Sequence, residues 1–191
     1  SKDFLNALFG ILLSALFIFS ALALLFAPIF ILIFAPGFYF DTLKQDLAVS
    51  LLRIMFPYLA LISLVAFAAG IQNSHNKFSI PAVTPLIFNL SLICSAWLVA
   101  PRIEIPVMAL AWGVLLAGFL QLLFQIAPLA TIKKIPVPKI DFQNPGVKKF
   151  FILILPAMLA GGIAQINLLI DTIFASLLIT GSPTWLYVSD R

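Results

Sequence analysis

The sequence predicts an all-α fold, a polytopic bundle of transmembrane helices. Hydrophobic residues make up 63% of the 191 residues and charged residues only 9%, whereas about 25% of the residues in an ordinary soluble domain are charged. A soluble fold of this length needs more polar side chains to cover its surface. The solvent around most of this chain must therefore be apolar.

The spacing of the charged residues gives the same result. About 20 residues at a rise of 1.5 Å each span a hydrocarbon core of roughly 30 Å, and the uncharged runs of this chain reach that length. The sequence therefore predicts five complete spans and the start of a sixth. The uncharged runs cover residues 4–40, 54–76, 78–101, 105–132, 150–170 and 172–189.

The first two expected spans cover about residues 4–34 and 46–71. Within the first, Pro28 should kink or end the helix before Pro36 and Gly37 close it.

The third and fourth expected spans form a helical hairpin. They cover about residues 80–100 and 105–131, and only residues 101–104 lie between them. A connection this short places two helices side by side in antiparallel orientation.

A basic loop follows over residues 132–149. It contains three prolines and five lysines, so it cannot be a regular spanning helix. Lysines beside a membrane gain about 1 kcal/mol each from anionic headgroups, which makes membrane lipids an expected partner. The chain has no nucleic-acid-binding motif, and no nucleic acid is expected.

The fifth expected span covers about residues 147–178. Beyond it, Ser182 suits a helix N-cap and Pro183 the first helical position, so residues 183–191 are expected to start a sixth span. The chain opens without Met and stops within this helix. We therefore expect residues 1–191 to be a single transmembrane bundle that is a fragment of a larger protein.

Lysine and arginine are divided unevenly between the two sides of the expected bundle. The side with more of them is cytoplasmic by the positive-inside rule, which places the amino end and the basic loop inside the cell. One side holds Lys2, Lys77, Lys133, Lys134, Lys139, Lys148 and Lys149, and the other holds Lys44, Arg53 and Arg102.

Enzymatic motifs are absent from the sequence. The single histidine, His75, excludes an H-E-x-x-H zinc helix, and there is no P-loop, G-x-S-x-G elbow or Asp-rich prenyl-diphosphate motif. The single cysteine, Cys94, cannot form an intrachain disulfide. These absences argue against an enzyme, and we expect no catalytic residue, metal or cofactor. If the chain transports a cargo, a coupling ion and the membrane potential both stay open as energy sources.

Three polar residues, Gln165, Asn167 and Asp171, lie within the fifth expected span. Asn167 and Asp171 share a face because they are four residues apart on a helix. A carboxylate inside a spanning helix is costly to desolvate and indicates a functional site. Two interpretations stay open, a substrate-binding position and a polar clamp or hydrated interface position.

Asp190 and Arg191 are ionisable residues of the sixth expected span. Counted from Ser182, they lie roughly 12 Å into the helix at 1.5 Å per residue. Each needs a partner from another helix, a cavity or a cargo, and an arginine suits a phosphate that its guanidinium can bind in a bidentate way. The alternative is a structural ion pair with another helix.

Pro156, Gly161 and Gly162 are expected to break the fifth span. Small residues and prolines in spanning helices most often permit close packing. In a transporter the same residues let a helix bend during alternating access, and both interpretations stay open.

Short motifs are spread over about residues 53–191. They are residues 53–59 (RIMFPYL), Gly70, Asn73, Ser74, residues 81–85 (PAVTP), Asn89, Pro156, residues 161–167 (GGIAQIN), Asp171, Thr172, residues 174–176 (FAS), Gly181, Ser182, residues 185–187 (WLY), Asp190 and Arg191. Together they resemble the MviN/MurJ family of lipid II flippases, within the superfamily of multidrug, oligosaccharidyl-lipid and polysaccharide exporters. Val188 and Ser189 depart from the family's Tyr-Ala but leave the Asp-Arg register intact.

The resemblance implies a fourteen-helix transporter of the bacterial cytoplasmic (inner) membrane, of which this chain would be the third through seventh helices and the start of the eighth. Its cargo would be lipid II, the polyprenyl-diphosphate-linked peptidoglycan precursor, moved by alternating access for cell wall synthesis. Asp190 and Arg191 would belong to the cationic cavity that receives the diphosphate and sugar, and the cell wall synthesis machinery would be a partner. Two alternatives stay open, an exporter of polysaccharide lipids or drugs and a membrane enzyme acting on a polyprenyl-diphosphate lipid.

Overall fold

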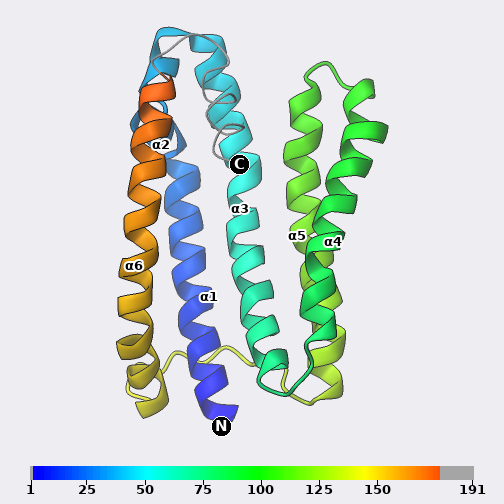
Figure 1. Cartoon of the computed structure of the whole chain (residues 1–191), viewed down its shortest axis with the longest axis vertical. Helices are drawn as coiled ribbons and strands as arrows, with labels where there is room; N and C mark the ends of the chain where they lie inside the picture. Colours follow the sequence, from blue (N-terminus) through cyan, green and yellow to red (C-terminus); the bar gives the residue numbers. More distant parts are fainter. Residues whose placement is uncertain (1, 177–191) are drawn as a thin grey trace. The chain divides into compact units, whose positions relative to one another are not determined.

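The computed structural model describes residues 2–176, with the side chains of Tyr39, Ala164, Asn167, Ala175 and Ser176 left out (Figure 1). The expected sixth span, residues 183–191, lies outside the described residues. All regular elements within them are helical, and five helices are long and apolar enough to cross a membrane, which confirms the predicted fold class. These spans are α1 (Lys2–Leu25), α3 (Thr42–Asn73), α4 (Ser79–Cys94) with its continuation to Arg102, α5 (Pro106–Thr131) and α6 (Pro145–Ser176).

Pro28 ends the first helix as the sequence predicts. The helix α1 stops at Leu25, and a short helix α2 (Ala27–Phe34) starts with the proline in its first turn. Proline is tolerated there because the N–H that it lacks would have no partner within the helix. A 3-10 turn, η1 (Pro36–Phe40), follows.

The chain divides into two compact units, each described here by itself. The first contains residues 1–24 and 51–142, and the second contains residues 25–50 and 143–191. Unit 1 therefore holds most of α1, most of α3, and all of α4 and α5. Unit 2 holds α2, η1, the start of α3, and α6.

The hairpin α4–α5 forms one side of unit 1, as predicted (Figure 1). The helix α4 continues into a π-helical turn, η2 (Ser95–Val99), and a 3-10 turn, η3 (Ala100–Arg102). Gly113 and Gly118 allow the close contacts of α5, since a Cβ atom at Gly113 would collide with Ser95 and one at Gly118 would lie 2.8 Å from the ring of Tyr58.

Four polar side chains, here called the amide cluster, are buried where α3, α4 and α5 meet. Gln72 and Gln125 are fully buried, while Gln121 and Thr84 are 2% and 5% exposed. Gln72 Nε2 donates to Gln125 Oε1 and, at 3.3 Å, to Gln125 O. Gln125 Nε2 donates to Thr84 Oγ1 at 2.7 Å, and Gln121 Nε2 donates to Thr84 O at 3.0 Å. Three spanning helices are thus joined by side-chain hydrogen bonds in the interior of unit 1.

In unit 2, α6 packs against α2 and η1. It begins at Pro145, where Asn144 Oδ1 accepts a hydrogen bond from Gly146 N at 2.9 Å. An asparagine N-cap followed by proline is a strong helix start, so Lys148 and Lys149 lie in the first turns of the helix rather than in a loop.

The expected break within α6 does not occur. The helix runs without interruption from Pro145 to Ser176, and it passes through Pro156, Gly161 and Gly162. One proline removes a single backbone hydrogen bond, and a spanning helix continues past it because the alternative exposes further backbone groups to lipid.

We predict that Gln125→Leu lowers the free energy of unfolding of the full-length protein by about 1–3 kcal/mol. The change removes the side-chain acceptor of Gln72 and the side-chain donor to Thr84 inside the bundle, and hydrogen bonds between membrane helices contribute about 0.6 kcal/mol on average. Unfolding by SDS titration measures the effect. Gln165→Leu, at an exposed glutamine of α6, is the matched control, and an equal loss in both variants would contradict the role of the cluster.

Candidate functional site

The predicted polar residues of the fifth span lie in the second half of α6. Gln165 and Asp171 are exposed. Six residues on a helix turn through about 600°, so these two side chains leave α6 on different faces. Asn167 lies in the helix four residues before Asp171, but its side chain is outside what the structure describes. The structure therefore does not bring Gln165 and Asp171 together.

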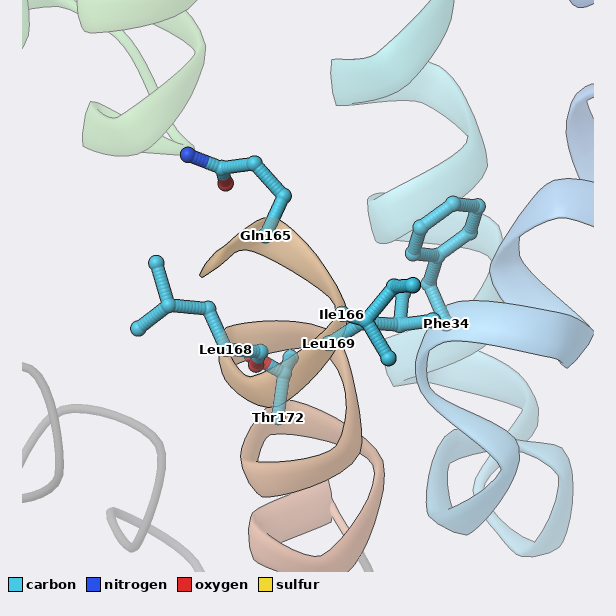
Figure 2. Close-up of a pocket in the computed structure, with 6 residues that line it drawn as sticks. All are labelled: Phe34, Gln165, Ile166, Leu168, Leu169 and Thr172. Carbon is cyan, nitrogen blue, oxygen red and sulfur yellow. The ribbon is translucent and has the colours of Figure 1, made fainter. Parts of the chain in front are cut away.

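Gln165 borders an open hollow on unit 2 with a volume of about 390 Å³. Figure 2 shows Ile166 and Leu169 turned toward the ring of Phe34 at the end of α2, while Gln165 and Leu168 point away from that ring. Thr172 Oγ1 donates to Leu168 O at 2.7 Å, so this hydroxyl is already engaged with its own helix. The hollow is lined by Phe34, Gln165, Ile166, Leu168, Leu169 and Thr172.

The surroundings of α6 distinguish it from the other spans. None of its apolar window is buried among the described residues, whereas 39% of the corresponding window of α5 is buried. Gln165 and Asp171 therefore present an amide and a carboxylate on a helix whose neighbours in the described part cover little of it. Such groups can bind the polar part of an amphiphilic molecule through hydrogen bonds, which an apolar medium strengthens.

Gly161 and Gly162 have open space around them. A Cβ atom at either position would meet nothing within 4 Å among the described residues. Packing in this part of the chain therefore does not require glycine at these positions. This observation favours the bending interpretation over the packing interpretation.

Asp190 and Arg191, the expected phosphate-binding pair, lie outside the described residues. Within residues 2–176 no group of three or more His, Cys, Asp or Glu side chains could hold a metal ion. The chemistry that the described part of the site offers is hydrogen bonding and charge, without a nucleophile paired to a base.

The amide cluster was not predicted from the sequence. A signal was present, because Gln121 and Gln125 are four residues apart in a charge-free run and must share one face of a helix. The partners Gln72 and Thr84 come from other helices, and no local pattern indicates that pairing.

The comparisons with known proteins all lead to one family. A family model described as lipid II flippase MurJ matches residues 1–191. A Buchnera aphidicola (subsp. Schizaphis graminum) protein named probable lipid II flippase MurJ is 38% identical over 190 residues, which are 100% of this chain and 37% of the relative.

Two further relatives are similar. The lipid II flippase MurJ of Burkholderia cenocepacia is 36% identical over 195 residues, covering 100% of this chain and 38% of the relative. The probable lipid II flippase MurJ of Vibrio cholerae is 41% identical over 166 residues, covering 83% of this chain and 32% of the relative. The chain thus spans a little over a third of the length of the curated relatives that it matches.

Proposed function

We propose that this chain, which belongs to the MurJ family of lipid II flippases, is part of a transporter that moves lipid II across the bacterial inner membrane without changing it chemically. The observation that carries the proposal is the match of the MurJ family model to all 191 residues. The five apolar helices and the family make the chain part of a multi-pass inner-membrane protein.

The chemistry of the cargo suggests which part of lipid II each residue binds. Lipid II joins an apolar polyprenyl chain to a diphosphate, a sugar and a peptide, so its head must be held while it crosses an apolar medium. In our proposal Arg191 binds the diphosphate in a bidentate way and Asp190 fixes the arginine's position. Gln165, Asn167 and Asp171 on α6 form hydrogen bonds to the polar head. Membrane lipids and the cell wall enzymes that use lipid II are further partners.

Bending of α6 belongs to the same proposal. Alternating access requires that some helices change shape between the inward-open and outward-open states. Pro156 leaves one backbone carbonyl of α6 without its helical partner, and the space around Gly161 and Gly162 leaves room for movement. These residues are the proposed point of flexure.

The proposed orientation places the amino end in the cytoplasm. In unit 1, the turn with Lys77 and the segment with Lys133, Lys134 and Lys139 lie at the end where α1 starts, which follows the positive-inside rule. With Cys94→Ala as background, we expect an impermeant maleimide to label Ile103→Cys from the periplasm and His75→Cys only after lysis. The opposite pattern would reverse the orientation.

We predict that Gly161→Ala combined with Gly162→Ala in the full-length protein lowers lipid II transport several-fold without lowering the melting temperature. A methyl group meets no neighbour in the described part of the chain, and alanine stiffens a helix by up to about 1 kcal/mol per residue relative to glycine. Gly70→Ala in α3, where the added Cβ also meets nothing, is the matched control. A loss of thermal stability parallel to the loss of transport would instead indicate a packing role.

We predict that Arg191→Ala abolishes growth rescue when the native flippase of a host is depleted. A hydrogen bond to a charged group contributes about 1.5–3 kcal/mol, so binding of lipid II should weaken roughly tenfold to a hundredfold. Arg191→Lys keeps the charge without the bidentate geometry and should rescue partially. Full rescue by Arg191→Ala at normal expression would exclude the assigned role.

A further inference from the structure

The segment of residues 132–140 that follows α5, here called the strap, is fixed across the end of unit 1. Lys134 N donates to Leu129 O at 3.0 Å, which ties the start of the strap to α5. Val137 N donates to Asn6 Oδ1 at 2.9 Å and Lys139 N donates to Asn6 O at 3.1 Å, which tie its other end to α1. Gly10 makes this approach possible, because a Cβ atom there would collide with the backbone of Lys139.

An apolar groove runs from the strap along α1, α3 and α5. It consists of two hollows of about 290 and 190 Å³, and Leu64 lines both of them. On α3 the lining residues follow one another from Pro57 in the first hollow to Ala68 in the second. Ile135 and Pro136 of the strap border the second hollow. The first hollow is lined by Leu13, Leu16, Phe17, Ser20, Leu24, Pro57, Ala60, Leu61, Leu64 and Phe119.

The length of the groove matches one leaflet of a bilayer. From Pro57 to Ala68 the helix α3 rises about 16 Å at 1.5 Å per residue, and half of a hydrocarbon core of about 30 Å is about 15 Å. The walls are apolar except for Ser20. A groove of this length and chemistry fits an acyl chain that enters from one membrane surface.

Positive charge gathers at the end of the groove that the strap crosses. Five lysines and two acidic residues lie at this end of unit 1, whereas two basic residues and one acidic residue lie toward its other end. Lys134 is half-buried and directly precedes Ile135, and the backbone of Lys139 lies against α1 at Gly10, which follows the groove-lining Phe9 in the chain. The charged residues at the strap end are Lys2, Asp3, Lys77, Lys133, Lys134, Lys139 and Asp141, and those toward the other end are Arg53, Arg102 and Glu104.

We propose that this groove binds one anionic phospholipid of the bilayer, with an acyl chain along α3 and the phosphate on Lys134 and Lys139. The lysines flank the part of the strap that covers the groove, so a single molecule reaches both the apolar walls and the positive charge. An anionic headgroup is favoured over a zwitterionic one by the net charge of this end. The lipid holds the strap against α1 and α3, and its binding does not depend on the transport of lipid II.

Lipid titration of the purified full-length protein, followed by native mass spectrometry, tests the proposal. The probes are phosphatidylglycerol and phosphatidylcholine with identical acyl chains. We expect wild type to bind phosphatidylglycerol more tightly and Lys134→Gln with Lys139→Gln to weaken that binding about thirtyfold, which corresponds to about 1 kcal/mol for each lysine. Lys148→Gln with Lys149→Gln removes the same charge from α6 and should leave the binding unchanged.

A second variant tests the apolar half of the site. Ala60→Phe places a ring in the first hollow, which Ala60 lines, and should weaken both lipids at an unchanged melting temperature. Equal binding of the two lipids by wild type, equal effects of the two lysine pairs, or undiminished lipid binding by a folded Ala60→Phe protein would overturn the proposal. Loss of lipid II binding instead of phosphatidylglycerol binding in Ala60→Phe would assign the groove to the cargo and would also overturn it.

Discussion

The apolar solvent is the constraint on which the rest of this structure depends. A bilayer core offers no water to backbone N–H and C=O groups, so each group must find its partner within the protein. The described residues meet this requirement by forming helices through the long uncharged runs and by turning where polar residues gather. The prolines Pro106 and Pro145 stand at helix starts, where the missing N–H breaks no hydrogen bond.

The same constraint acts on polar side chains, and the two units meet it in different ways. In unit 1, Gln72, Thr84, Gln121 and Gln125 are buried and bond to one another across three helices. In unit 2, by contrast, the polar side chains of α6 are exposed in the described part of the chain. Hydrogen bonds between buried side chains join helices of one fold, whereas an exposed carboxylate in a spanning helix needs water, another helix or a cargo. This contrast is why α6, rather than the amide cluster, carries the proposed site.

Sequence reasoning was sufficient for features that local chemistry determines. The fold class, the hairpin α4–α5 and the break at Pro28 follow from uncharged runs, a short connection and a missing N–H. The continuity of α6 through Pro156 was missed because a proline removes one backbone hydrogen bond wherever it stands, and the local sequence does not say whether the helix continues past it. The partners of Gln125 and the contact of Gly10 with the strap could not be predicted either, because they join residues far apart in the chain. Of the site, the sequence indicated Gln165 and Asp171, but not how little of α6 the described part of the chain covers.

In our proposal, the protein containing this chain moves lipid II to the outer leaflet. The most direct test follows lipid II in spheroplasts that depend on the full-length protein, with a soluble lipid II-cleaving enzyme added outside. We expect lipid II to be cleaved while the protein is present and to become protected, at undiminished total amount, once the protein is depleted. Equal cleavage before and after depletion, or conversion of lipid II to a new product by the protein itself, would contradict it.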